Sequence, residues 1–189
     1  MTRTYTLKKR AEKLAETRQR IVEAAVELHG TVGPAATTLS QIAERAGVQR
    51  HTLYAHFPDE RSLHMACSGL FFGERSPLPD PETWRTIPDQ RDRLRTALGE
   101  MYAWYERNAP LVACVLRDME HHALTREIAQ LRMGPVMATM GEVLGEGLRP
   151  EQLAQLRLAL SFHTWRSLVR ESGLEPDAAV QAMVRAVLG

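Results

Sequence analysis

A single glycine between two short helical segments constrains the fold of this chain more than any other feature of its sequence. The first segment begins at Thr38 and ends near Ala46, and its opening residues TLSQ match a capping box. In that motif the Thr38 hydroxyl accepts a hydrogen bond from the Gln41 N–H, while the glutamine side chain reaches back to residue 38. Gly47 suits the left-handed residue that ends a helix, and a second helical segment follows at once and runs to about Ala55.

Small and apolar residues around this glycine favour a close crossing of the two helices. Ala43 is small at the position where the helices would cross, and Leu53 can be buried against Ile42 of the first helix. Two short helices joined by a tight turn form the helix-turn-helix plan. The sequence therefore predicts a helix-turn-helix between Thr38 and Ala55.

The second helix carries polar side chains suited to a nucleic acid. These are Gln49, Arg50, His51, Thr52, Tyr54 and His56. The N-terminal part of such a helix enters the major groove, where Arg can pair with guanine, Gln with adenine, and a Thr methyl with thymine. Tyr54 and His56 suit phosphate oxygens, and Thr38 can present its hydroxyl and backbone N–H to a phosphate. A solvated polar helix face is the alternative interpretation.

Charge is distributed unevenly along the 189 residues. Residues 1–20 hold seven basic and two acidic side chains, whereas residues 58–189 hold 15 Arg against 18 Asp or Glu. A basic end beside a mildly acidic body is consistent with a polyanionic partner, and equally with a solvated tail.

The remaining apolar spacing is helical, with no alternating strand pattern. Expected helices cover Asp59 to Gly73, 89–107, 110–121, 124–148, 150–172 and 176–188, with a proline-rich linker at 76–81. Pro110 is expected to start a helix, and Gly134-Pro135 to kink or split one. We predict an all-α fold of about nine helices, comprising a basic arm (1–13), a DNA-binding domain (14–74) and a ligand-binding and dimerisation domain (75–189).

The stretch from about Arg18 to Ala66 resembles the TetR family of bacterial transcriptional regulators. The residues that carry the resemblance are Ile21, Ala24, Ala25, Leu28, Gly33, Thr38, Ile42, Ala43, Ala46 to Val48, Leu53, Tyr54, His56, Phe57 and Leu63. The resemblance implies a homodimer with two DNA-binding heads and a C-terminal body that holds a small molecule. It also implies that Thr38, Tyr54 and His56 contact the DNA backbone and that Gln49 to Thr52 read bases.

Three positions depart from the family pattern. A small residue is usual where this chain has His51, a serine-like cap is usual at Gln49, and a phosphate-binding lysine is usual where this chain has Glu60. Because an acid facing DNA would repel it, we expect Arg61 to take over that contact. The basic arm before Arg18 can compensate as well.

The sequence carries no catalytic set, no metal-ligand spacing and no cofactor motif, so we expect neither an enzyme nor a cofactor. His121 and His122 are adjacent and point about 100° apart on a helix, which does not suit a shared metal. Cys67 and Cys114 are expected to be small buried hydrophobes. No signal peptide and no run of about 18 apolar residues is present, so we expect a soluble, cytoplasmic protein with no membrane partner.

Large flexible and aromatic side chains concentrate in the C-terminal part, where they can line a pocket for a hydrophobic or aromatic ligand. The candidates are Met101, Trp104, Tyr105, Met137, Phe162 and Trp165. Plain core packing is the alternative. The last two helices each carry an apolar stripe, which can form a four-helix dimer interface or be buried within one subunit.

We therefore expect a ligand-responsive repressor that binds double-stranded, palindromic operator DNA as a homodimer. One alternative is a helical small-molecule-binding or enzymatic protein in which the N-terminal motif is only structural. Another is a DNA-binding protein whose body is filled and senses nothing.

Overall fold

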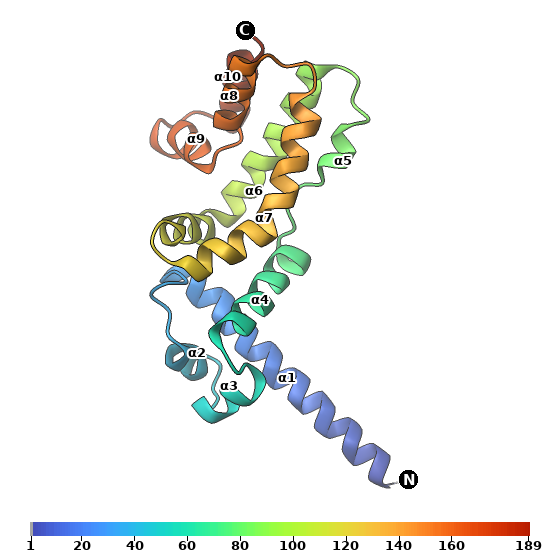
Figure 1. Cartoon of the computed structure of the whole chain (residues 1–189), viewed down its shortest axis with the longest axis vertical. Helices are drawn as coiled ribbons and strands as arrows, with labels where there is room; N and C mark the ends of the chain where they lie inside the picture. Colours follow the sequence, from blue (N-terminus) through green and yellow to red (C-terminus); the bar gives the residue numbers. More distant parts are fainter. Residues whose placement is uncertain (1) are drawn as a thin grey trace. The chain divides into compact units, whose positions relative to one another are not determined.

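The chain folds into helices joined by short connections (Figure 1). The computed structural model describes the backbone of residues 2–189 and the side chains from residue 7 onward. Its elements are α1 (Thr2–Thr31), α2 (Leu39–Arg45), α3 (Arg50–His56), α4 (Glu60–Leu70), the π-helix η1 (Phe71–Arg75), α5 (Pro81–Trp84), α6 (Gln90–Met119), α7 (Ala123–Gly145), α8 (Pro150–Ala159), α9 (Phe162–Trp165), the π-helix η2 (Arg166–Glu171) and α10 (Pro176–Leu188). The predicted all-α class is confirmed, with ten α-helices among the described residues where about nine were expected.

The helices divide into two compact units. Unit 1 comprises residues 1–75 together with 113–129, and unit 2 comprises 76–112 together with 130–189. Unit 1 thus includes the end of α6 and the beginning of α7, which the sequence-based domain division placed in the C-terminal body. Among the described helices, none is long and apolar enough to cross a membrane.

Several helices differ from the predicted ones. The expected basic arm is the beginning of α1, which runs without a break from residue 2; the side chain of Arg3 in that arm lies outside the described ones. Pro110 does not start a helix but lies inside α6, and Pro135 does not split α7. A proline costs such a helix one hydrogen bond, and in α6 the buried side chains of Tyr105 and Val112 on either side of Pro110 offset that cost by packing.

The helix expected at 150–172 is broken after α8. The Tyr102 hydroxyl donates a hydrogen bond to the Ala159 carbonyl (3.0 Å), and the Tyr105 hydroxyl donates one to the Leu160 carbonyl (2.6 Å). Burial raises the pKa of both tyrosines, so their hydroxyls keep the protons that they donate. Ser161 then caps α9 by accepting a hydrogen bond from the His163 N–H. The side chains of another helix therefore satisfy the carbonyl groups that end α8.

The core of unit 1 forms where α1 packs against α2, α3 and α4. Ile42, Ala43 and Leu53 are all buried, as the sequence predicts. Gly47 has a φ of +64°, and its N–H donates to the Glu44 carbonyl at 3.0 Å, which confirms the left-handed turn. The capping box at Thr38 and the N-cap at Asp59 are confirmed as well.

Three histidines lie close together in unit 1. The ring centroids of His29 and His64 are 4.7 Å apart, and those of His64 and His122 are 6.3 Å apart. Cys67 Sγ lies 3.6 Å from His29 Nδ1, whereas His29 Nε2 is buried without a hydrogen-bond partner among the described residues. Burial, reinforced by the neighbouring His64, lowers the pKa of His29 to about 3, and burial also lowers the pKa of His64. The surroundings of His29 and His64 therefore favour neutral imidazoles at these two positions.

Asp118, at the end of α6, anchors the turn between α1 and α2. Its carboxylate accepts hydrogen bonds from the Ala35 N–H (2.9 Å) and from Arg117 Nε (2.8 Å), while Arg117 also donates to the Val32 carbonyl. Burial alone would raise the pKa of this carboxyl group, but the hydrogen bonds from Arg117 and Ala35 hold it below its usual value. Gly33 permits the approach, because a side chain there would collide with Arg117 and Asp118.

We expect the stability of unit 1 to fall as the pH decreases below about 6.5. An unfolded chain protonates His29 near pH 6.5, whereas the folded chain does so only near pH 3. The unfolded state therefore binds more protons between these values, and His29 alone should cost about 1.4 kcal/mol of unfolding free energy per pH unit. Urea unfolding between pH 7.5 and 5.5 measures this decrease. The variant His29→Leu should flatten the dependence and His163→Leu, at an exposed position, should not; parallel curves for wild type and His29→Leu would contradict the assignment.

Replacing Gly47 should destabilise the protein through the backbone alone. An added Cβ would meet only the end of the Arg20 side chain at 3.9 Å. The cost of Gly47→Ala is therefore that of the left-handed conformation, about 1–2 kcal/mol. Gly99→Ala is the matched control, because Gly99 lies inside α6 with nothing within 4 Å of an added Cβ. It should stabilise the protein by about 0.4–1 kcal/mol. Both changes can be measured by chemical denaturation, and equal effects of the two substitutions would contradict this account.

Candidate nucleic-acid interface

Helix α3 buries one side chain completely in unit 1 and exposes several others. Leu53 is completely buried, whereas Arg50, His51 and Tyr54 are exposed. Tyr54 is 43% exposed, which is high for a large aromatic side chain that contributes nothing to the core. The buried leucine sets the rotation of the helix, so the polar residues at its N-terminal end face away from the protein.

The remaining predicted base readers lie at the same end of α3. Gln49 is the exposed N-cap residue, and its side chain makes no capping hydrogen bond. Thr52 is half-buried, and its hydroxyl lies 3.4 Å from His51 Nε2. His56, at the other end of the helix, is half-buried as well. The structure thus groups Gln49 to Thr52 at the start of α3 and places His56 near its end.

Thr38 uses its polar groups within its own helix. Its backbone N–H and its hydroxyl both lie 2.8 Å from Gln41 Oε1, and its hydroxyl accepts a hydrogen bond from the Gln41 N–H at 3.3 Å. A phosphate contact by Thr38 would therefore compete with the capping box. The prediction that this residue contacts the DNA backbone stays a prediction.

Arg61, expected to replace the missing lysine, is paired with an acid. Its Nε lies 3.2 Å from Glu127 Oε1, and a second guanidinium nitrogen contacts the same oxygen. Glu60 faces His64 Nε2 at 3.7 Å. Both side chains of the Arg61–Glu127 pair are about half exposed. Because solvent screens such a pair, it contributes little to stability and can exchange with a phosphate.

Two arginines hold α2 and α3 in place, and sequence reasoning missed both. Arg20 donates a hydrogen bond to the Ala46 carbonyl (3.3 Å) at the end of α2, and the Arg18 guanidinium lies 4.8 Å from the centre of the Phe57 ring at the end of α3. Their place in a basic segment suggested contacts with a polyanion instead. The spacing of apolar residues cannot predict that Arg20 of α1 donates a hydrogen bond to the end of α2, because that contact joins two helices.

The aromatic members of the predicted ligand pocket pack against one another in unit 2. Ring centroids are 5.4 Å apart for Tyr105 and Phe162, and 5.2 Å apart for Phe162 and Trp165. Trp104 joins them beside Tyr105, and Met101 is completely buried. Met137 lies elsewhere, in a groove of about 520 Å³ between α7 and α8. The aromatic side chains thus pack against one another in the core of unit 2, and none of them lines the groove that contains Met137.

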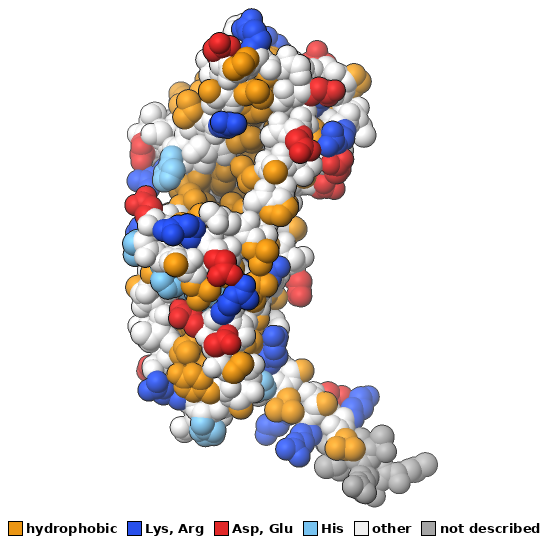
Figure 2. Space-filling model, in the orientation of Figure 1, with side chains coloured by type: hydrophobic (Ala, Val, Ile, Leu, Met, Phe, Trp, Pro, Cys, Tyr) orange, Lys and Arg blue, Asp and Glu red, His pale blue; other side chains and the backbone are white. Residues whose placement is uncertain are grey.

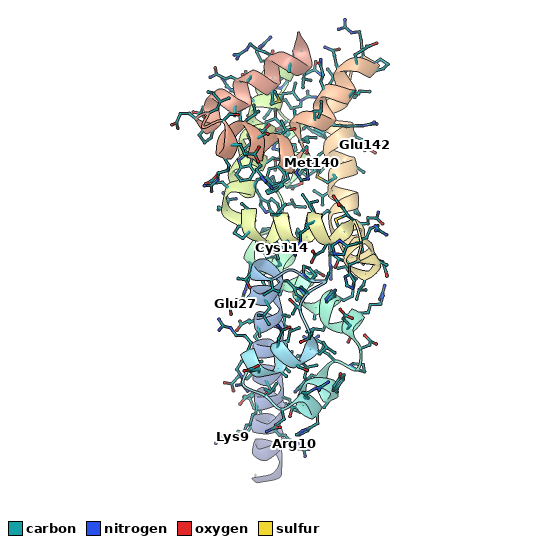
Figure 3. All side chains as sticks on the ribbon, turned by 90° about the vertical axis from the view of Figure 1, so that its left-hand side faces the viewer. Lys9, Arg10, Glu27, Cys114, Met140 and Glu142 are labelled. Carbon is teal, nitrogen blue, oxygen red and sulfur yellow. The ribbon has the colours of Figure 1, made fainter. Side chains whose placement is uncertain are left out.

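The groove is apolar with two charged side chains. Its lining residues are Met137, Ala138, Gly141, Glu142, Leu153, Leu156, Arg157 and Leu160. Figure 3 labels Glu142 and Met140 on the upper part of α7. Within the part of the chain that the structure describes, no group of His, Cys, Asp and Glu has the geometry of a metal site.

Comparisons with known proteins bear first on unit 1. Residues 21–66 match the family described as bacterial regulatory proteins of the tetR family. The HTH-type transcriptional regulator SrpR of Pseudomonas putida is 48% identical over 50 residues, which cover 26% of this chain and 24% of SrpR. The HTH-type transcriptional activator FasR of Mycolicibacterium smegmatis is 32% identical over 99 residues, covering 50% of this chain and 42% of FasR. These matches span less than half the length of either relative.

Solved structures extend the likeness to the fold of nearly the whole chain. The hemolysin II transcriptional regulator HlyIIR matches with a TM-score of 0.68 at 15% identity, covering 93% of this chain and 99% of HlyIIR. At that identity the likeness concerns the fold alone. Residues 21–66 thus match the tetR family of bacterial regulatory proteins, and the fold of nearly the whole chain is similar to that of HlyIIR.

Proposed function

We propose that this protein is a ligand-responsive transcriptional repressor that binds a palindromic operator as a homodimer. The observation that carries the proposal is the orientation of α3, where buried Leu53 turns Arg50, His51 and Tyr54 away from the protein. In helix-turn-helix proteins this end of the second helix enters the major groove. Transcriptional activation is the second candidate, favoured by the similarity to FasR, which is named an activator.

Base reading in this proposal belongs to the start of α3. Arg50 can pair with guanine O6 and N7, and Gln49 with adenine N6 and N7. The bulk of His51 then restricts which base can lie next to it. Tyr54 and His56 bind phosphate oxygens, which position the helix without reading sequence.

The proposed dimer uses the outer face of the C-terminal helices. The inner face is already buried within one chain, because α8 and α10 pack against each other and enclose Leu156, Val180 and Val184. Leu158 on α8 is 62% exposed and Leu174, before α10, is 38% exposed. A second copy covering these residues would bring two α8–α10 pairs together as a four-helix interface.

The proposed ligand is a hydrophobic molecule bound in the groove between α7 and α8. The groove has a volume of about 520 Å³ and an apolar lining, which lies in the range of small-molecule sites. A protein of the same fold, FadR of Bacillus subtilis, is described in complex with stearoyl-CoA, with a TM-score of 0.66 at 14% identity. Arg157 at the groove suits an anionic end on such a ligand.

The regulatory mechanism follows from the spacing of the two heads. Reading a palindrome requires recognition helices about 34–36 Å apart, one turn of DNA. A ligand that binds better to a dimer with a different spacing shifts the population away from the DNA-bound state.

DNA binding is tested by gel shift with the DNA that flanks the protein's own gene. Arg50→Ala should weaken binding by about 1–3 kcal/mol and relax the preference at one base pair. Tyr54→Phe should weaken binding by a smaller amount that is equal for all sequences, because a phosphate contact reads no base. Arg91→Ala, which removes an exposed arginine of unit 2, is the control. A wild-type protein that binds no such DNA, or an Arg50→Ala variant with unchanged selectivity, would contradict the proposal.

Ligand response is tested by thermal shift with long-chain acyl compounds, followed by operator binding with and without each stabilising compound. We expect stabilisation of about 2.7 kcal/mol at a hundredfold excess over the dissociation constant. Arg157→Glu should abolish the shift for anionic compounds, whereas Arg91→Glu, at an exposed position of α6, should not. Compounds that stabilise the protein yet leave operator affinity unchanged would count against ligand control.

A further inference from the structure

The N-terminal half of α1 is a helix that the core of unit 1 does not cover. At 1.5 Å per residue, its first fifteen residues span about 22 Å. The buried residues of α1 begin only at Ile21, and every side chain from Leu7 to Glu16 is exposed. An isolated helix of this length is only marginally stable in water. Local contacts support it, among them a hydrogen bond from the Thr17 hydroxyl to the Lys13 carbonyl and the Lys8–Glu12 pair at 4.0 Å.

The exposed segment carries an excess of positive charge on one side. Its basic residues from Leu7 onward are Lys8, Lys9, Arg10 and Lys13, and its acidic residues are Glu12 and Glu16. With about 100° of rotation per residue, Lys9, Lys13 and Arg10 fall within a sector of about 100°. Lys8 and Glu12 pair with each other, which leaves Glu16 at the edge of the basic sector. Figure 2 shows Lys and Arg side chains along this part of the helix.

This segment lies at the same end of unit 1 as α3. Figure 1 and Figure 3, which view the chain from directions 90° apart, both show the start of α1 extending beyond α3. Lys9 and Arg10 are labelled at that end in Figure 3. A duplex held at α3 would therefore pass beside the exposed half of α1. Duplex DNA presents one negative charge per about 1.7 Å of its axis, so several phosphates would lie along a helix of this length.

A second copy of the same helix is the competing occupant. Leu7 and Leu14 are 62% and 51% exposed, and they lie seven residues apart, a spacing found in paired helices. Pairing two copies would, however, bring their basic sectors close together, and like charges repel. Charge complementarity therefore favours a polyanion over a second copy.

From these observations we infer that the N-terminal half of α1 is a second DNA-binding element, which holds the phosphate backbone beside the base-reading helix through Lys9, Arg10 and Lys13. The inference rests on the proposed function, because it requires a duplex at α3. It supplies phosphate contacts in a head where Glu60 stands near the DNA and where Arg61 is engaged by Glu127. Arg18 and Arg20 do not belong to this element, since they hold α3 and α2 in place.

The test compares the salt dependence of operator binding by the full chain and by the triple variant Lys9→Gln/Arg10→Gln/Lys13→Gln. Glutamine is a good helix former, so the variant should keep α1 helical, which circular dichroism verifies. The slope of log affinity against log salt concentration should become shallower by about 0.9 for each phosphate that the variant no longer neutralises. Base preference should stay unchanged. The matched control, Arg91→Gln/Arg95→Gln/Arg107→Gln, removes the same charge from exposed positions of α6 in unit 2 and should leave the slope near that of the wild type.

The outcomes separate this inference from the function on which it rests. A wild-type protein that binds no operator overturns the proposed function. Two results overturn the inference alone, provided that the wild-type protein binds the operator. In the first, the triple variant has the same salt slope as the wild type. In the second, the control variant has a salt slope as shallow as that of the triple variant. Sedimentation velocity on Leu7→Ser/Leu14→Ser addresses the competing occupant. Weakened self-association of that variant, together with a triple variant that keeps the wild-type salt slope, would assign the segment to helix pairing.

Discussion

The left-handed backbone at Gly47 is the constraint on which the DNA-binding head depends. With a φ of +64°, the chain reverses within a few residues, and the Val48 N–H returns to the Ala43 carbonyl at 2.9 Å. Only because the turn is this tight can Leu53 reach the core that contains Ile42 and Ala43. The same burial turns Arg50 and Tyr54 outward. The φ angle of Gly47 thus determines which side chains of α3 are exposed to a partner.

A second layer of contacts holds this head together from outside the helix-turn-helix. Asp118 binds the turn before α2, Arg20 ends α2, and Arg18 covers Phe57 at the end of α3. Asp118 lies in the segment 113–129, where α6 ends and α7 begins. Since α6 and α7 also contribute residues to unit 2, the chain passes between the two units at more than one place. The proposed ligand groove involves the part of α7 that belongs to unit 2.

Charge is divided between structural and interacting roles within α1. The arginines nearest the core, Arg18 and Arg20, serve the fold, whereas Lys9, Arg10 and Lys13 lie on a segment that contributes nothing to the core. A basic helix that extends beside α3 offers phosphate contacts that the acid at Glu60 cannot make. The buried histidines His29 and His64 contrast with these charged residues, because burial lowers the pKa of each ring and favours its neutral form. Unit 1 therefore combines a charged outer helix with an interior that favours neutral groups.

The sequence by itself determined the local features that depend on near neighbours. The capping box at Thr38, the left-handed Gly47, the N-cap at Asp59 and the burial of Leu53 all follow from residues a few positions apart, and the structure confirms them. The match to the tetR family lies in the same part of the chain. Tertiary structure decided the features that join distant residues. Pro110 stays inside α6 because buried side chains on both sides hold the helix together, and α8 ends at Ala159 because the hydroxyls of Tyr102 and Tyr105, more than fifty positions away, satisfy its last carbonyls. The Arg61–Glu127 pair and the contacts among the aromatic rings of the expected pocket have the same origin. Hydrogen bonding and packing act between groups that come together only after the chain has folded.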